Sequence, residues 1–437
     1  MRRYVLIGSG PAGIAAAEAI RKHDPQSEIV LISAESQGYY SRPGLAYYLT
    51  GEIPEQSLYP YPRADFAQLN IRNLNTVVRK IEVPNHQIEL VDGRKLRYDR
   101  LLIATGANAA QVQVPGIELT GVVKLDNIAD AQNILKLMRK ARSAVVVGGG
   151  ITALEIVEAL VSQKVNPHYF LRGDRYWSNV LDEPESRIVE QRLHEEGVKI
   201  HFHTELAEII GKRGRVVGVA TTTGERIKCQ MVAIAIGIRP RIELAQAAGL
   251  PTERGILVNE YLQTSQSDIY AAGDVAQVFD PLTGKTVIDS LWGPAREQGY
   301  TAGQNMCGLA QIYRKDTPFN VTRLAGLTTT IIGTVGRGID DDLIGIARGD
   351  SETWRQLPDA IAAQSGFDVN HLRILVGENK LLGALVMGDQ TLSHPLYKLI
   401  SQQANILSIR EQLLTPQAPI AELLVDFWSQ FSQRSAA

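Results

Sequence analysis

The chain begins with a short apolar stretch that leads into glycines and then into an alanine-rich stretch. Residues 4–7 (YVLI) predict a buried strand, GSGPAG at 8–13 predicts a tight turn, and the alanines that follow predict a helix. A second apolar run, EIVLIS at 28–33, predicts the next strand. The opening is therefore typical of a strand–turn–helix–strand unit.

The same pattern returns 140 residues later. Residues 143–158 read SAVVVGGGITALEIVE, so that Gly148 and Gly150 correspond to Gly8 and Gly10 (148 − 8 = 150 − 10 = 140). Strand and helix patterns then alternate to about residue 238. This alternation predicts parallel α/β layers, in two modules of the same kind.

Between the two modules and after the second one, the pattern favours antiparallel strands. Short strands alternate over 71–103, with a hairpin turn at Asp92-Gly93. From about residue 319, strand-like runs at 328–335, 372–376 and 381–387 precede two late helical patterns. We expect a separate C-terminal α+β unit there. The last helix carries its apolar residues on one face, which predicts docking onto the body or onto a second subunit: Ile420, Leu423, Leu424, Phe427, Trp428 and Phe431.

The spacing of the first glycines suits a dinucleotide. Gly8 permits the tight turn, Gly10 allows the backbone to approach a pyrophosphate, and Gly13 allows close packing of helix on strand. The helix N-terminus would then present free amides and a positive dipole end to the phosphates. Glu35 stands just past the second strand, where an acid binds a ribose. Ala153, in the third position of the second copy, is an accepted variant of the fingerprint.

Other features bear on the same site. Arg42 lies in a loop rich in Gly, Pro and aromatic residues, and its guanidinium suits a pyrophosphate. The segment TSQSDIYAAGD places Asp274 after a glycine at the end of a short strand, where a carboxylate can accept hydrogen bonds from ribityl hydroxyls. Gly293-Pro294 predicts the start of a helix whose positive end would point into the site.

Length and composition set the broad class. The 437 residues allow about three domains. A net charge of −2 with mixed signs favours neither nucleic acid nor an anionic membrane as the main partner. No apolar run is long enough to span a membrane, no signal peptide precedes the first strand, and a cytoplasmic location is the expectation. Cys229 and Cys307 are far apart and form no CxxC motif, so we expect neither a disulfide framework nor a paired-thiol redox centre.

With these landmarks in place, the chain resembles the FAD- and pyridine-nucleotide-dependent oxidoreductase superfamily. The motifs GSGPAG, LLIATGA, VVVGGGxxALE and TSxxxIYAAGD occur in the family's order. The loop YYSRPGLAYYLTGE, the run LWGPAREQGYTAGQNMCG and the final α+β domain resemble NAD(P)H:rubredoxin reductases and the flavin portion of assimilatory nitrite reductases most.

The resemblance implies two Rossmann-like dinucleotide-binding domains, as in glutathione reductase, followed by a C-terminal α+β interface domain. The FAD-binding domain would comprise residues 1–111 and 246–318, the NAD(P)H-binding domain 112–245, and the interface domain 319–437. By the same resemblance, FAD would be bound by Gly8, Gly10, Pro11, Ala12, Gly13, Glu35, Arg42, Thr105, Gly106, Gly273, Asp274 and Ala295. The nicotinamide nucleotide would be bound by Gly148, Gly150, Ile151, Thr152, Arg172, Arg175 and Gly237. Glu155, near the reactive nicotinamide, and Trp292, bordering the isoalloxazine, would be the catalytic residues.

Departures from the family narrow the chemistry. Disulfide- and peroxide-handling relatives carry a redox cysteine where this chain reads PGLAYY from Pro43, so such chemistry should be absent. Tyr47 replaces a lysine of many ferredoxin reductases, and their WSDQ segment is missing, which disfavours a ferredoxin partner. NADH-specific members usually have an acid in the stretch that here reads HYFLRGDR. Arg172 or Arg175 could instead contact a 2′-phosphate, and we favour NADPH over NADH.

Without a neighbouring thiol, a reduced flavin must pass its electrons to an external acceptor. We expect a reductase that serves a small iron protein such as rubredoxin. An NAD(P)H oxidase or quinone reductase, with a small-molecule acceptor, is the first alternative, and a redox-sensing flavoprotein with little turnover is the second. His201 and His203 alternate on a predicted strand, but no third ligand is close in sequence, so we expect no metal site there.

Overall fold

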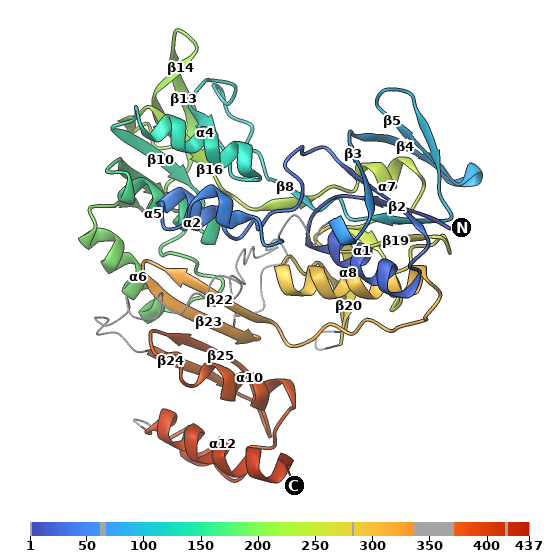
Figure 1. Cartoon of the computed structure of the whole chain (residues 1–437). Coiled ribbons are helices and arrows are strands. Elements are labelled where there is room, and N and C mark those ends of the chain that lie inside the picture. The colour runs from blue at the N-terminus through green and yellow to red at the C-terminus, as the bar shows by residue number, and fades with distance from the viewer. Residues whose placement is uncertain (1, 62–66, 282–283, 336–370, 416–417, 437) are drawn as a thin grey trace.

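A computed structural model describes residues 2–61, 67–281, 284–335, 371–415 and 418–436 (Figure 1). Its first sheet has five parallel strands in the order β19-β7-β1-β2-β3. The strands are β1 (Arg3–Ile7), β2 (Glu28–Ser33), β3 (Ile71–Asn75), β7 (Arg100–Ile103) and β19 (Ile269–Ala271). The central strands are apolar and buried almost throughout, because both faces of a parallel sheet are covered. The predicted strand over 28–33 is confirmed.

The second sheet repeats this design in the order β12-β11-β10-β16-β9, again parallel. Its strands are β9 (Val122–Val123), β10 (Ser143–Val147), β11 (Asn166–Phe170), β12 (Lys199–His201) and β16 (Met231–Ile234). Its helices are α4 (Ile128–Met138), α5 (Ile151–Ser162) and α6 (Glu183–Glu195). Three antiparallel strands follow: β13 (Leu206–Lys212), β14 (Arg215–Thr221) and β15 (Arg226–Lys228). Their apolar side chains form a small core together with side chains from one face of this parallel sheet. The predicted α/β class with two parallel modules is confirmed.

Two helices from distant parts of the chain pack side by side over the first sheet: α1 (Pro11–His23) and α8 (Trp292–Met306) (Figure 1). Small residues allow their backbones to approach closely. A Cβ atom at Gly299 would overlap the carbonyl oxygen of Ala12, and one at Gly303 would lie 2.6 Å from the carbonyl oxygen of Ala16. This close approach brings the N-terminus of α8 beside that of α1.

The chain passes between the two sheets along an antiparallel pair, β8 (Ala107–Ala109) with β17 (Ile238–Pro240). A second link is α2 (Leu45–Thr50), which follows β2 in sequence but packs on α5 and α4 (Figure 1). The remaining elements of this part are η1 (Glu55–Leu58), η2 (Val83–Asn85), β4 (Val78–Glu82), β5 (Gln87–Leu90), β6 (Lys95–Arg97), α7 (Glu243–Ala247), β18 (Ile256–Leu257), β20 (Ala276–Asp280) and β21 (Lys285–Val287). The hairpin predicted at Asp92-Gly93 joins β5 and β6.

The C-terminal unit is an antiparallel sheet in the order β22-β23-β25-β24. Its elements are β22 (Phe319–Leu324), β23 (Leu327–Gly333), β24 (His371–Val376), β25 (Leu381–Met387), α10 (Ser393–Ser401), α11 (Arg410–Leu413) and α12 (Ile420–Ala436). The predicted apolar face of α12 packs into this unit's own core, with Leu424 fully buried. In the described part of the chain, no helix is long and apolar enough to cross a membrane.

Candidate functional site

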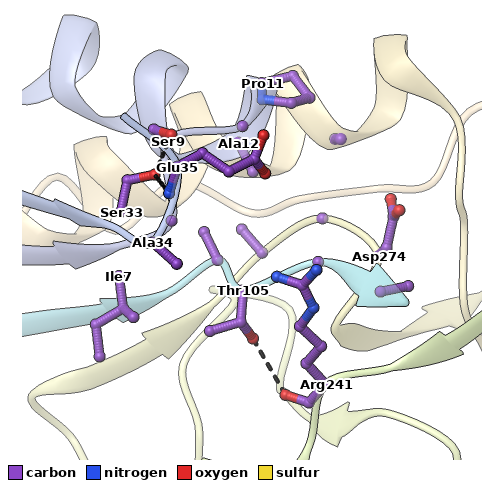
Figure 2. Close-up of a pocket in the computed structure, with 18 of the residues that line it drawn as sticks. Ile7, Ser9, Pro11, Ala12, Ser33, Ala34, Glu35, Thr105, Arg241 and Asp274 are labelled. Carbon is purple, nitrogen blue, oxygen red and sulfur yellow. Dashed lines mark hydrogen bonds between the residues drawn. The ribbon is translucent and has the colours of Figure 1, made fainter. Parts of the chain in front are cut away.

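A cavity of about 600 Å³ lies at the carboxyl ends of the first sheet's strands, beneath the N-termini of α1 and α8 (Figure 2). Ligands bind parallel α/β sheets at this edge. Twelve of the predicted residues line it: Gly8, Gly10, Pro11, Ala12, Glu35, Arg42, Thr105, Gly106, Gly273, Asp274, Trp292 and Ala295. Residues from five separate stretches of sequence therefore converge on one space.

The glycines of the first turn divide into two structural roles. Gly8 has φ +118, and a Cβ atom there would overlap the carbonyl oxygen of Ala104. Gly13 does not line the cavity, and a Cβ atom there would overlap the carbonyl oxygen of Gly8. Gly10 caps α1 in extended conformation with nothing within 4 Å of a Cβ position. Gly8 and Gly13 are thus required for packing, while Gly10 keeps the helix N-terminus open to a ligand.

Glu35 and Arg42 contact one another. The Arg42 guanidinium donates to the Glu35 carboxylate and to the backbone carbonyl of Asp126, and the Tyr40 hydroxyl donates to Glu35 at 2.6 Å. Burial raises the pKa of Tyr40 above its ordinary value, so this hydroxyl stays protonated and donates. The pair fixes the direction of both side chains at the cavity wall.

The N-terminus of α8 is held in place by side chains around Trp292. The Arg296 guanidinium lies over the Trp292 ring, 5.3 Å from its centroid, and donates to Glu18 at 2.8 Å. Farther along α8, the Gln298 side chain accepts a hydrogen bond from the backbone N–H of Gly273 at 2.8 Å. The loop that carries Asp274 is thereby tied to α8.

The second glycine turn repeats the geometry of the first on the other sheet. Gly148 has φ +143, and a Cβ atom there would overlap the carbonyl oxygen of Ala235, whereas Gly150 has nothing within 4 Å of a Cβ position. The predicted Ile151, Thr152 and Glu155 follow in the first turns of α5. None of these residues lines the 600 Å³ cavity. The two turns therefore belong to separate places in the described structure.

The acid that follows the second strand of the first module is not matched at the equivalent position of the second module, where Asp174 stands one residue farther on. Ile32 and Phe170 occupy equivalent register positions, each paired with the last residue of the glycine-turn strand. Three residues beyond them stand Glu35 and Gly173. A glycine replaces the carboxylate, and its neighbour Arg172 is exposed.

The remaining predicted residues lie near this second turn or on the crossover. Arg175 pairs with Asp174 at 3.3 Å and also donates to the carbonyl of Ser178 at 3.4 Å. Gly237 (φ +119) precedes β17, and its carbonyl accepts from the N–H of Ala110. Arg172 is thus the more available of the two arginines for a ligand.

One expectation about histidines is wrong. His201 and His203 do not share a strand face, because β12 ends at His201 and His203 adopts φ +49. His201 instead stacks on His168 of the neighbouring strand, with ring nitrogens 3.0 Å apart. Burial lowers the pKa of both rings, as expected for two neutral imidazoles in contact.

A cluster that the sequence did not indicate joins β24 to α6. Asp182, Glu185 and His371 bring possible ligand atoms within 4.8 Å of one another. The Arg373 guanidinium already occupies the space between the carboxylates, 2.7 Å from Glu185 and 3.7 Å from Asp182. The cluster is accordingly an ion-pair network that fastens the C-terminal sheet.

Neither cysteine is near the cavity. Cys229 is buried in the second module, and burial raises the pKa of its thiol to about 12. Cys307 follows the far end of α8. Among the described residues that line the cavity there is no thiol, and Pro43 lies in its wall.

Known proteins share the sequence pattern and the fold of this chain. Residues 2–299 match the family described as pyridine nucleotide-disulphide oxidoreductase. The chain is 33% identical over 306 residues to a rubredoxin-NAD(+) reductase of Ectopseudomonas oleovorans, covering 70% of this chain and 80% of the relative. It is also 33% identical over 317 residues to an NADH oxidase of Methanocaldococcus jannaschii, covering 70% of each. A crystal structure of a ferredoxin reductase from Rhodopseudomonas palustris superimposes with a TM-score of 0.81 at 23% identity, over 97% of this chain and 99% of that one, which supports the fold.

Proposed function

The chain belongs to the pyridine nucleotide-disulphide oxidoreductase family, and on that premise we propose that it passes electrons from a reduced nicotinamide nucleotide, through FAD in the 600 Å³ cavity, to a small iron protein such as rubredoxin. Family membership makes it an NAD(P)H-dependent flavoprotein oxidoreductase. The observation that carries the choice of an external acceptor is the absence of a thiol among the described residues that line the cavity, and the similarity to a rubredoxin-NAD(+) reductase favours an iron protein. With Pro43 in its wall, this site lacks the group that disulfide-handling relatives use, and electrons must leave for an external acceptor.

Residues that line the cavity suit successive parts of FAD: the diphosphate, the adenosine ribose and the ribityl chain. The open N-terminus of α1 at Gly10 suits the diphosphate, because its free amides and dipole favour negative charge. Glu35 suits the adenosine ribose and Asp274 the ribityl chain. When bound, FAD accepts a hydride and can release electrons one at a time. The N-terminus of α8 would stabilise negative charge on the pyrimidine side of the ring.

Two side chains have proposed roles in electron transfer. Trp292 lines the cavity and is clamped by Arg296, so it can border the ring in one fixed orientation. Glu155, one turn into α5 and past the second glycine turn, would orient the nicotinamide. Gly148, Gly150, Ile151 and Thr152 would hold the phosphates of that nucleotide, as their counterparts do for FAD.

We further propose NADPH as the preferred donor. Gly173 replaces the ribose-binding acid, and exposed Arg172 stands next to it, which suits a 2′-phosphate. The ratio of kcat/KM for NADPH and NADH tests this proposal. A ratio below one would refute it.

The acceptor is tested by mixing the anaerobically reduced enzyme with rubredoxin, a plant-type ferredoxin, a quinone and oxygen in parallel. Fast reoxidation by rubredoxin with slow reoxidation by oxygen supports the proposal. The similarity to an NADH oxidase makes oxidase activity the alternative, and oxygen outpacing every carrier would establish it. Slow reoxidation by all four would indicate a redox-sensing flavoprotein.

A further inference from the structure

One guanidinium that the sequence motifs did not point to lies inside the cavity. Arg241 follows β17, on the return crossover from the second sheet to the first. Figure 2 shows its side chain rising from the cavity floor between Thr105 and Asp274, toward the N-terminal end of α1. Nothing in its local sequence, GIRPR, resembles a phosphate-binding motif.

The main chain and the stem of Arg241 are fixed. Its backbone N–H donates to the carbonyl of Gly106 at 2.9 Å, and its carbonyl accepts from the Thr105 hydroxyl at 3.1 Å (Figure 2). Its Nε donates to the Asn108 side chain at 2.7 Å. Because Asn108 belongs to the outgoing crossover strand β8, both crossover strands orient the guanidinium before any ligand binds.

Arg241 differs from its neighbour Arg42 in having no carboxylate of the described chain in direct contact with it, and its charge is only partly balanced by the more distant carboxylates of Asp126, Glu35 and Glu243. Among the described residues, no carboxylate lies within ion-pair distance of Arg241, whereas Arg42 is paired with Glu35. The carboxylate of Asp126 is already engaged by Lys124 at 2.5 Å and by the N–H of Ala109 at 2.6 Å. Burial and the positive charge of Arg42 lower the pKa of Arg241 below its ordinary value. A half-buried guanidinium with no carboxylate in contact is well suited to bind an anionic ligand.

We propose that Arg241 binds the diphosphate of FAD, opposite the N-terminus of α1, as a second guanidinium beside Arg42. This inference rests on the proposed assignment of FAD to the cavity. In Figure 2 the guanidinium lies between Glu35, the proposed ribose ligand, and Asp274, the proposed ribityl ligand, and the diphosphate joins those two parts of FAD. A planar guanidinium fork suits phosphate oxygens.

The experiment compares Arg241→Gln with Arg239→Gln in the full chain after the flavin has been removed. Arg239 is on the same crossover, carries the same charge, is exposed and does not line the cavity. Binding of FAD, ADP, adenosine and riboflavin is measured for each variant by calorimetry. Because a charge-assisted hydrogen bond is lost, Arg241→Gln should weaken FAD and ADP roughly tenfold to hundredfold. Adenosine and riboflavin, which lack the diphosphate, should bind as to the wild type, and Arg239→Gln should change nothing.

Arg241→Lys keeps the positive charge but lacks the planar guanidinium with its paired N–H donors. It should therefore bind ADP more tightly than Arg241→Gln but less tightly than the wild type. Unchanged FAD and ADP affinity in Arg241→Gln would overturn the inference, and so would an equal loss for riboflavin, since that would indicate a structural role. If the wild-type chain took up no FAD at all, the proposed function itself would fail, a result distinct from the other two.

Discussion

The most informative perturbation places a methyl group at each of the two open glycines, one at a time. Gly10 (φ −76) and Gly150 (φ −108) both have extended backbone that alanine adopts, and both have open space where the Cβ atom would stand. Alanine is a poorer N-cap than glycine, so each variant should lose no more than about 1 kcal/mol of helix stability. Both proteins should therefore fold.

The effect on ligands should be specific to each site. A Cβ atom at Gly10 would stand where the FAD diphosphate approaches the backbone, and one at Gly150 where the nicotinamide nucleotide does. If each methyl group breaks one charge-assisted hydrogen bond to the ligand, the binding free energy falls by about 1.5–3 kcal/mol. This corresponds to roughly a 10- to 150-fold loss of affinity. Gly10→Ala should be purified with little flavin. Gly150→Ala should be yellow, but with a KM for the reduced nicotinamide nucleotide raised by that factor.

The assay is the flavin-to-protein ratio after dialysis, followed by steady-state kinetics with added FAD. Circular dichroism checks that both variants are folded. Gly8→Ala and Gly148→Ala are the contrasting pair, because there a Cβ atom would overlap backbone carbonyls and should impair folding itself. Loss of flavin from Gly150→Ala, or full retention of flavin by Gly10→Ala, would refute the assignment of one nucleotide to each turn.

Three further predictions follow from individual contacts. Gly299→Ala would force apart the backbones of α1 and α8, cost about 1–3 kcal/mol and lower Tm by a few degrees, and an unchanged Tm would contradict the packing argument. Burial raises the pKa of Glu158 to about 7, so the folded state binds an extra proton and stability falls as pH rises from about 4.5 to 7. Glu158→Gln should therefore increase the free energy of unfolding at pH 8 by at most about 3 kcal/mol and raise Tm there, with hardly any change at pH 5; a Tm gain of equal size at both pH values would contradict this reasoning. Arg172→Ala should raise the KM for NADPH about tenfold and leave that for NADH unchanged, with a smaller effect for Arg175→Ala, and equal effects on both nucleotides would exclude a 2′-phosphate contact.

The sequence predicted most of the fold because its signals are local. The apolar run before Gly8 and the one before Gly148 each lie next to the turn that ends them, so strand, turn and helix could be assigned from a few adjacent residues. The apolar face of α12 was equally evident, since its period lies within one helix.

Contacts between distant segments were not predictable in the same way. Arg42 was expected to bind phosphate, and its ion pair with Glu35 depends on how the loop after β2 folds back. Arg241 was missed because only the pairing of β8 with β17 brings it to the cavity. His203 was misplaced because the predicted strand ran to residue 203, whereas β12 ends at His201 and the backbone of His203 has a positive φ.

The central claim is that this chain binds two different nucleotides and transfers electrons from one to the other and then outward. The most direct measurement is anaerobic stopped-flow spectroscopy of the purified protein mixed first with NADPH and then with oxidised rubredoxin. We predict rapid bleaching of the flavin absorbance by NADPH, followed by its return as rubredoxin is reduced. A flavin spectrum that does not change on addition of either NADPH or NADH would contradict the claim.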